Sequence, residues 1–362
     1  MVFPKGQRYY SGMSVPLFAL RTCESTGCGD FLDLKDVGRF AKSCGFDLVQ
    51  LLPVNDTGMN SSPYSNVSSM ALNPIYLRLN RVSYGRDVPD LIAELREKLE
   101  TPGRGRYREA YAGKLSVLKE IYRRNLHALL SDDTISTWVA SNGWVQTYAV
   151  YSFLKEQNNS APWNDWKEYG DPDATFIATF WIQHKSEVFF YAWVQYECEM
   201  QLSEAAGALR DMGVNLKGDL PILMCEDSAD VWASRSLFNL KKRAGAPPDQ
   251  FSELGQNWGF PVYDWDGHRD AVLRFWKKRI QKAATFYAAY RIDHVLGFFR
   301  IWSIDVHNIT GSLGVFSPSV GLSRKDLYDA GFDDARIAWL SEPHIPLHAI
   351  QSCTADPPDE II

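Results

Sequence analysis

The chain has 362 residues, 45% of them hydrophobic, and a net charge of −6, with 38 Lys and Arg against 44 Asp and Glu. That length accommodates one large domain or two to three ordinary ones, and the apolar content is sufficient for a sizeable core. The acidic balance argues against a nucleic-acid partner. The longest apolar runs fall short of the roughly 18 residues that a transmembrane helix needs, so no membrane partner is predicted.

The N-terminal segment and the cysteines indicate the compartment. Residues 1–21 contain a short apolar patch broken by Pro16, and they lack the hydrophobic stretch and cleavage site of a signal peptide. No C-x-x-C pair occurs, which argues against a zinc site or a disulfide framework. The six cysteines are scattered along the chain: Cys23, Cys28, Cys44, Cys198, Cys225 and Cys353. These features predict free thiols and a cytoplasmic location.

The first elements of the chain read as a strand–helix–strand unit. Residues 12–20 are predicted to form a short buried strand. An amphipathic helix follows, with apolar positions at Leu34, Val37, Phe40 and Ala41, and Gly45 ends it. The apolar segment 47–54 is the next predicted strand. Such a return is typical of a parallel sheet.

A long polar loop and a charged helical region come next. Residues 54–74 form the loop after the second predicted strand, and loops at the carboxyl ends of parallel strands carry functional sites. Residues 81–140 are charged and helical, and we expect an inserted helical subdomain there.

The middle of the chain repeats the return from helix to strand. Helices are predicted over 143–157 and roughly 184–212, and the second leads into a strand at 214–224. The segment 225–232, "CEDSADVW", then lies on a loop. Residues 244–265 have many Gly and Pro and little periodicity, so they are predicted to be an ordered loop.

A last helix, about 268–286, delivers the chain to the strand "YAAYRID". Beyond residue 303 the chain is irregular with helical pieces, and an eight-stranded barrel needs more chain than remains. The predicted organisation has four parts: the first βα units with the substrate loop (1–80), the helical subdomain (81–140), the barrel continuation (141–302) and an irregular, truncated end (303–362).

Arg291, Asp293 and His294 stand together in an otherwise apolar stretch. Burying lone charges costs several kcal/mol, so the group is either a structural ion pair or a site. Its position at the end of a third parallel strand favours a site. Arg291 would keep Asp293 ionised as a nucleophile or base, and His294 would donate to a substrate hydroxyl.

Cofactor chemistry is not predicted. The seven histidines are dispersed, and Pro343 and Pro346 disrupt a helical pairing of His344 with His348. Phosphate-binding G-x-x-x-x-G-K-[ST] and nucleophile-elbow G-x-S-x-G motifs are absent. We therefore expect neither a metal nor an organic cofactor.

Five segments in chain order resemble one known family. They are "SPYSNVSSMALNPIYL" (62–77), "DSADVW" (227–232), "AGAPPD" (244–249), "GQNWGFPVYDW" (255–265) and "RIDHVLGFFRIW" (291–302). Together they resemble the 4-α-glucanotransferases, the amylomaltase or disproportionating-enzyme family of glycoside hydrolases, and most of all its cytosolic transglucosidase branch. The resemblance implies an α/β fold, a (β/α)8 TIM barrel with inserted helical subdomains, here incomplete at the C-terminus.

The resemblance also implies site residues and an activity. Asp293 corresponds to the family's nucleophile, which attacks an anomeric carbon in a retaining double displacement. The implied substrate-binding residues are Arg291, His294, Tyr64 and Trp258, with Asp227 and Asp230 at positions where the family varies. The expected activity is transfer of α-1,4-glucan segments from a maltooligosaccharide or glucan donor to the 4-hydroxyl of an acceptor sugar.

One part of the family pattern is missing. A retaining mechanism needs a second carboxyl about 5–5.5 Å from the first, and the family's "AEDLG"-like and "THD"-like motifs do not occur here. Glu342, in "SEPHIP", is a weak candidate. Two other hypotheses stay open. One is a glucan-binding fragment or degenerate paralogue without catalysis. The other is an α-amylase-type hydrolase, against which the SPY and GQNWG segments argue.

Overall fold

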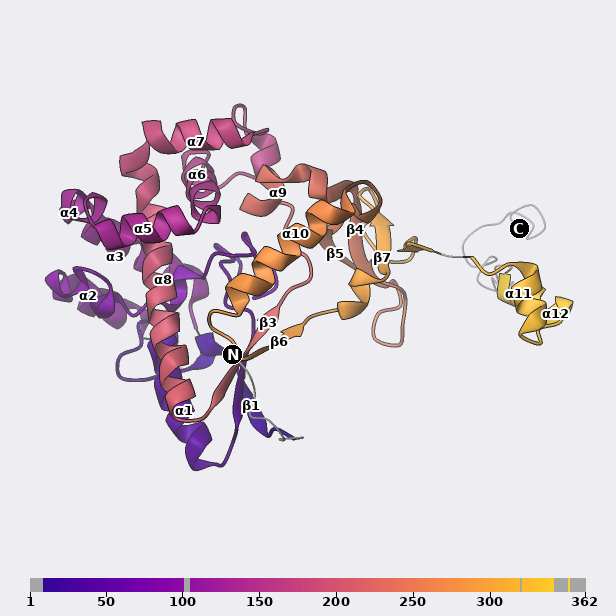
Figure 1. The fold of residues 1–362 in the computed structure, drawn as a ribbon, viewed down its shortest axis with the longest axis horizontal. Helices are drawn as coiled ribbons and strands as arrows, with labels where there is room; N and C mark the ends of the chain where they lie inside the picture. The colour runs from indigo at the N-terminus through magenta and orange to yellow at the C-terminus, as the bar shows by residue number, and fades with distance from the viewer. Residues whose placement is uncertain (1–8, 101–104, 320, 342–350, 352–362) are drawn as a thin grey trace. The chain divides into compact units, whose positions relative to one another are not determined.

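The computed structural model of the protein describes residues 9–100, 105–319, 321–341 and 351. The chain divides into two compact units, Met1–Ser317 and Pro318–Ile362. Figure 1 shows that the first unit combines a parallel sheet, a large set of helices and a second, antiparallel sheet.

The parallel sheet consists of β1 (Gly12–Val15), β2 (Leu48–Leu51), β3 (Asn215–Leu220) and β6 (Ala289–Ile292), in the order β1-β2-β3-β6. Helix α1 (Leu34–Ser43) makes the crossover from β1 to β2. Its inner side buries Leu34, Val37 and Ala41 as predicted, whereas Phe40 is 56% exposed. The first predicted strand is shorter than expected, because a 3-10 turn at Leu17–Ala19 replaces its second half.

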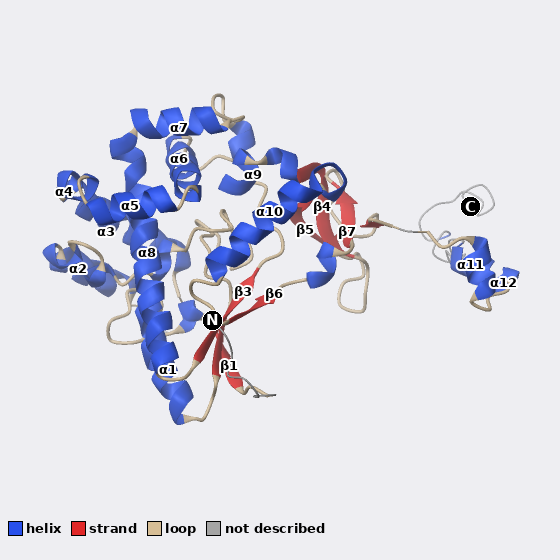
Figure 2. Ribbon diagram, viewed as in Figure 1, coloured by secondary structure: helices blue, strands red, loops and turns tan. Residues whose placement is uncertain are grey.

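The long connection from β2 to β3 is mostly helical, as Figure 2 shows. Its α-helices are α2 (Pro89–Leu99), α3 (Tyr107–Arg124), α4 (Leu126–Leu130), α5 (Asp133–Ser141), α6 (Trp144–Gln157), α7 (Ala174–Gln183) and α8 (Lys185–Asp211). Helix α8 buries side chains along its whole length, including Trp193 and Cys198. A helix that is buried on several sides is the central support of such a group. The helical region therefore runs well past residue 140, through α8.

The second sheet corrects the expectation of a loop over 244–265. Strands β4 (Phe238–Ala246) and β5 (Gln256–Tyr263) pair antiparallel there, and β7 (Ile301–Asp305) and β8 (Val315–Ser317) extend the sheet in the order β5-β4-β7-β8. Glycine permits this pairing rather than preventing it. A Cβ at Gly245 would lie 2.0 Å from the carbonyl oxygen of Gln256, so only a residue without a side chain fits.

Two further helices complete the first unit. Helix α9 (Ala229–Ala233) follows β3, and α10 (Trp265–Ala283) leads to β6. Buried Arg279 on α10 donates to the carbonyl oxygen of Pro221 (2.7 Å), which comes directly after β3. Because of this bond, α10 is fixed against the carboxyl end of β3.

The second unit contains α11 (Arg324–Asp329) and α12 (Asp334–Ser341). Ser323 and Asp326 form a reciprocal capping box at the start of α11. Over the described ranges of both units, no helix is long and apolar enough to cross a membrane. The cysteines that the structure describes, which exclude Cys353, are all free thiols.

Candidate active site

The site is built on the carboxyl ends of two neighbouring strands, β3 and β6. Asp219 of β3 stands opposite Arg291 of β6 in the parallel register. Residues opposite one another in adjacent strands project to the same face of a sheet, so the two side chains meet. The backbone N–H of Asp293 donates to the carbonyl oxygen of Leu220 (3.1 Å), which continues the strand pairing by one residue. The predicted position of Asp293 at a strand end is confirmed.

Arg291 holds the charged groups together through three bonds from its guanidinium. Its Nε donates to Asp219 Oδ1 (2.9 Å), and its Nη2 donates to Asp219 Oδ2 (2.6 Å). The same Nη2 lies 3.4 Å from Asp293 Oδ1. The first two bonds form the planar fork that Arg makes with carboxylates, which fixes the guanidinium in orientation as well as in charge.

Tyr64 joins this group from the polar loop that follows β2. Its hydroxyl accepts a hydrogen bond from Arg291 Nη2 (2.6 Å) and donates one to Asp219 Oδ2 (3.0 Å). Burial, together with the Asp219 carboxylate, raises the pKa of Tyr64 to about 12. The phenol therefore remains protonated at neutral pH and keeps its donor role. The loop after β2 and the end of β6 thus meet at Tyr64 and Arg291.

Asp219 is the main residue that the sequence analysis missed. Its side chain is fully buried, and burial raises its pKa, against the lowering effects of the Arg291 and Tyr64 hydrogen bonds. The Asp293 side chain, by contrast, is 44% exposed and has only the longer contact with Arg291. Both oxygens of Asp219 thus accept hydrogen bonds from Arg291 or Tyr64, whereas the Asp293 carboxylate is accessible to a ligand. The signal for Asp219 was its place at the end of an apolar strand, in "GDLP".

His294 continues the group with an unusual backbone. Its φ of 50° and ψ of 48° lie in the left-handed region, which costs a non-glycine residue strain and is frequent at functional sites. Burial lowers the pKa of His294, partly offset by the Asp293 carboxylate, so the imidazole is neutral at pH 7. The Trp258 ring of β5 meets it edge to face, with centroids 4.9 Å apart. The structure therefore brings Trp258 to this site from the antiparallel sheet.

Asp227 and Asp230 have other partners. Asp230 on α9 accepts hydrogen bonds from the Ser69 backbone N–H (2.6 Å) and hydroxyl (2.8 Å), which ties α9 to the loop that carries Tyr64. Asp227 accepts from Tyr151 Oη (2.8 Å) and forms an ion pair with Lys155. These contacts hold loops in place, and a role for either carboxylate in substrate binding stays a prediction. Glu342 lies outside the described residues.

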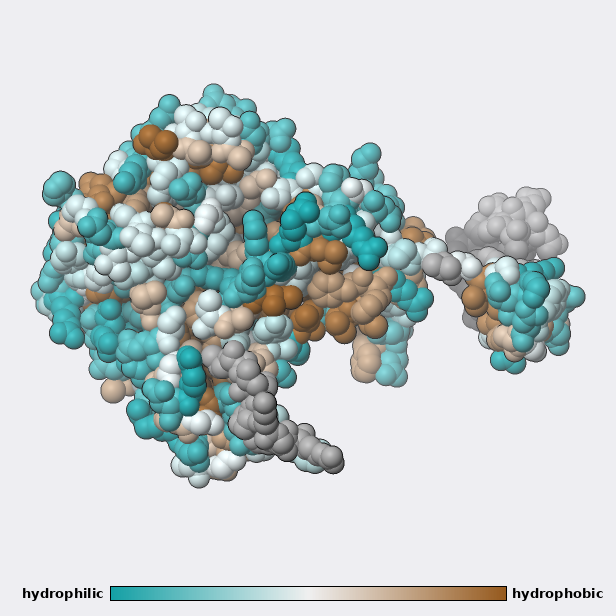
Figure 3. All heavy atoms as spheres, in the orientation of Figure 1, coloured by the Kyte–Doolittle hydropathy of each residue, from teal (hydrophilic) through white to brown (hydrophobic). Residues whose placement is uncertain are grey.

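An apolar turn adjoins the charged group. The segment after His294 exposes Val295, Leu296 and Phe299, whose exposed fractions are 49%, 65% and 73%. In Figure 3, apolar surface gathers on this face of the first unit around the connection from β6 to β7. Carboxylate, donors and apolar surface are thus combined on one side of the first unit, as in many small-molecule sites.

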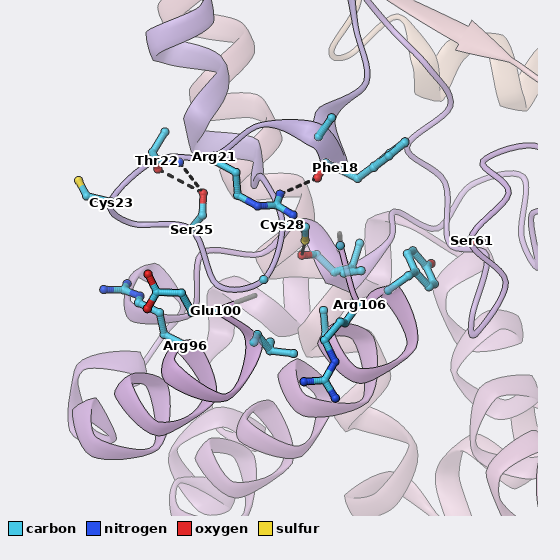
Figure 4. Close-up of a pocket in the computed structure, with 17 residues that line it drawn as sticks. Phe18, Arg21, Thr22, Cys23, Ser25, Cys28, Ser61, Arg96, Glu100 and Arg106 are labelled. Carbon is cyan, nitrogen blue, oxygen red and sulfur yellow. Dashed lines mark hydrogen bonds between the residues drawn. The ribbon is translucent and has the colours of Figure 1, made fainter. Parts of the chain in front are cut away.

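A cavity of about 840 Å³ lies elsewhere, between the segment after β1 and the ends of α2 and α3. Figure 4 shows its lining. Arg21 donates there to the Phe18 carbonyl (2.9 Å), and Cys28 Sγ contacts the Ile75 carbonyl (3.4 Å). No residue predicted for the site lines this cavity. In the part of the chain that the structure describes, no group of three His, Cys, Asp or Glu residues could hold a metal ion.

A parallel sheet with carboxylates gathered at its carboxyl edge is typical of an α/β protein whose site lies at the strand ends. Comparison with known proteins identifies the family. The sequence profile described as Glyco_hydro_77, 4-alpha-glucanotransferase, matches residues 15–342, and the chain belongs to this family.

Two relatives show how much of the family's length is present. The 4-alpha-glucanotransferase DPE2 of Oryza sativa subsp. japonica is 37% identical over 346 residues, which are 92% of this chain and 36% of that protein. The 4-alpha-glucanotransferase of Chlamydia caviae is 37% identical over 312 residues, 85% of this chain and 58% of that protein. The chain thus spans between about a third and three fifths of these relatives.

The fold agrees with this assignment. An amylomaltase from Streptococcus agalactiae, solved in complex with acarbose, superposes with a TM-score of 0.74 at 23% identity, over 94% of this chain and 70% of that one. Amylomaltase from Corynebacterium glutamicum gives 0.69 at 23% identity, over 85% and 44%. These neighbours have the TIM-barrel fold, so the predicted fold class is confirmed. The described residues supply four of the parallel strands.

Proposed function

We propose that this chain carries the nucleophile half of a 4-α-glucanotransferase site and acts on α-1,4-glucans by a retaining double displacement. The observation that supports this most directly is the contrast between the two carboxylates. Asp219 is buried and fully engaged by Arg291 and Tyr64, while Asp293 is half-exposed beside the same guanidinium. The Arg291 guanidinium lies 3.4 Å from Asp293 Oδ1, and an accessible carboxylate is what a nucleophile requires.

In the first step, an oxygen of Asp293 bonds to the anomeric carbon while the glycosidic C–O bond breaks. The departing sugar oxygen takes a proton from a second carboxyl group. In the second step, the 4-hydroxyl of an acceptor sugar gives its proton to that same group, and its oxygen displaces Asp293. Neutral His294 and the Arg291 guanidinium would donate to sugar hydroxyls, and the Trp258 ring would contact the sugar face.

We assign the second carboxyl to none of the described residues. Asp219 does not suit this role, because both of its oxygens already accept hydrogen bonds. A cytoplasmic location and a starch- or maltose-related substrate agree with this proposal.

Product analysis after incubation with maltotriose tests the proposal. Transfer predicts glucose together with oligosaccharides longer than maltotriose, and Asp293→Asn should reduce both by about three powers of ten or more. Glucose and maltose without longer products would instead indicate hydrolysis. Binding of maltotriose without any product would indicate a glucan-binding chain that does not catalyse transfer.

A further inference from the structure

The cavity between the segment after β1 and the ends of α2 and α3 carries an excess of positive charge. Its volume of about 840 Å³ lies within the range of roughly 300–1,000 Å³ that is usual for small-molecule sites. Three guanidinium groups and one carboxylate line it, and Figure 4 labels all four: Arg21, Arg96, Arg106 and Glu100. The residues gathered at the ends of β3 and β6 do not line this cavity, so it is separate from the candidate active site.

Arg21, in the segment after β1, has no acidic partner among the described residues. Its Nη1 donates to the carbonyl oxygens of Phe18 (2.9 Å) and Leu20 (2.8 Å). These two bonds fix the guanidinium in orientation but leave its charge unbalanced. An anion in the cavity would therefore supply the opposite charge that this group lacks.

Arg96 of α2 and Arg106, directly before α3, have acidic neighbours that stand outside the cavity. Arg96 Nη2 lies 3.9 Å from a carboxylate oxygen of Glu24, and Arg106 Nε lies 3.3 Å from one of Glu109. Neither glutamate lines the cavity, and all four side chains are partly exposed. Exposed ion pairs contribute little. A ligand that binds both guanidinium groups would therefore compete with weak partners only.

A buried lysine adds positive charge behind the cavity wall. Lys114 of α3 is fully buried, and its Nζ donates to the carbonyl oxygens of Ile75 (2.5 Å) and Leu77 (2.9 Å). No carboxylate of the described residues pairs with it. Burial raises the pKa of Cys28 in the cavity wall, and Lys114 and Arg21 counteract that effect. The positive field of these two cations thus reaches the wall of the cavity.

The apolar part of the lining indicates a ligand larger than an inorganic ion. Phe18, Ile75, Leu99 and Ala110 line the cavity beside the charged groups. A carboxylate carries a single charge, whereas a phosphate monoester carries about −1.5 to −2 near pH 7 and offers three acceptor oxygens. Guanidinium groups bind such oxygens in pairs. Three of them around one cavity therefore match a phosphate group better than a carboxylate.

We propose that this cavity binds a phosphate monoester, with the phosphate among Arg21, Arg96 and Arg106 and an apolar organic body against Phe18 and Leu99. The site goes beyond glucan transfer and does not depend on it, because it is built from residues that the proposed reaction does not use.

Calorimetric titration of the full chain with phenyl phosphate tests this site, in a phosphate-free buffer of low ionic strength that limits screening. Inorganic phosphate and phenol form two further arms, which carry the charge alone and the apolar body alone. We expect phenyl phosphate to bind more tightly than either of them, by about tenfold or more.

Charge variants of the wall give effects of opposite sign. Arg21→Gln and Arg106→Gln each remove one guanidinium and should weaken phenyl phosphate binding by about tenfold or more. Glu100→Gln removes the carboxylate of the lining and should strengthen binding by about threefold. Arg123→Gln is the matched control, because Arg123 lies at the other end of α3 in an exposed ion pair with Glu120, and it should leave the affinity unchanged.

Thermal unfolding of each variant checks that the fold is retained, and Arg106→Gln and Glu100→Gln keep the test decisive if Arg21→Gln does not fold. A chain that does not bind phenyl phosphate would overturn the proposal, as would equal affinities for phenyl phosphate and either of the other two compounds. Equal affinities of Arg106→Gln, Glu100→Gln and Arg123→Gln would also overturn it, because the anion would then bind elsewhere on the protein.

Discussion

At the scale of single residues, the site depends on two aspartates that differ in burial and in their contacts with Arg291. The sequence does not distinguish between them. Asp219 and Asp293 both follow apolar strand residues, yet one is buried in a fork with Arg291 and the other is half-exposed. Their roles differ because of the register, which places Asp219 directly opposite Arg291. Asp219 holds the guanidinium, whose Nη2 lies 3.4 Å from Asp293 Oδ1.

The first prediction concerns Asp219→Asn. The substitution removes the charge that Arg291 is paired with, and hydrogen bonds to charged groups contribute about 1.5–3 kcal/mol each. We expect a loss of that order in the free energy of unfolding, measured by urea denaturation, and a larger relative loss of any transfer activity. Asp305→Asn is the control, because its ion pair with Lys242 is exposed and should contribute little. Equal effects of the two substitutions would contradict the assigned role of Asp219.

The second prediction concerns pH. The pKa of His294 is lowered by burial, so the unfolded chain binds a proton more readily than the folded one as the pH falls through the usual histidine pKa of about 6.5. The stability that this neutral imidazole contributes is present above that pH and is lost below it. Asn tolerates the left-handed backbone, so His294→Asn should preserve the turn.

The free energy of unfolding of the unmodified chain should therefore fall more steeply between about pH 7 and pH 5 than that of His294→Asn. Denaturant titrations at a series of pH values measure both slopes. Parallel slopes would show that His294 does not change its proton affinity on folding.

At the scale of elements, the loop after β2 connects the helical insertion to the site. Asp56, near its start, is buried without a cation and accepts from Tyr148 of α6, Tyr111 of α3 and the Gly58 backbone N–H. Burial raises the pKa of Asp56, and these three donors counteract that effect. The insertion therefore holds the start of the loop, while Tyr64, in the middle of the loop, is held at Arg291.

The third prediction follows from this arrangement. Tyr148→Phe leaves a buried carboxylate oxygen without its donor, which costs about 1–3 kcal/mol or more for a charged group. Tyr122→Phe is the matched control, because Tyr122 is similarly buried and donates only to the neutral Ser186 carbonyl. Thermal unfolding should show a clearly larger loss for Tyr148→Phe. A loss no larger than that of the control would mean that Asp56 does not need this donor.

Elements with strong periodicity could be predicted from the sequence, and elements that depend on pairing could not. α1 and α10 were recognisable from their apolar spacing, α6 and α8 were predicted without such a spacing, and the strand before Asp293 was predicted from the helix that precedes it. β4 and β5 were missed because Gly245 and the nearby prolines resemble a loop locally. Their pairing is visible only once the close approach to Gln256 is known. Asp219 was missed for the same reason, since its function depends on a partner 72 residues away.

At the scale of the whole molecule, the chain supplies part of a family fold. The described residues contain four parallel strands, the helical insertion and an antiparallel sheet from which Trp258 meets His294. The family profile covers residues 15–342, while the chain spans 36% of one relative and 58% of another. The described residues thus contain the proposed nucleophile, Asp293, with Arg291, Asp219 and Tyr64 grouped beside it.

An activated donor makes attack by Asp293 measurable on its own, without the proton donor of the first step. The fluoride of a maltosyl fluoride leaves without needing a proton, so attack by Asp293 does not depend on the second carboxyl. The most direct measurement is fluoride release from this donor, together with mass spectrometry of the chain after denaturation. We predict release above background and a maltosyl adduct on the peptide that contains Asp293, both lost in Asp293→Asn. Fluoride release that is equal in the unmodified chain and Asp293→Asn, or an adduct on another residue, would contradict the assignment of Asp293 as the nucleophile.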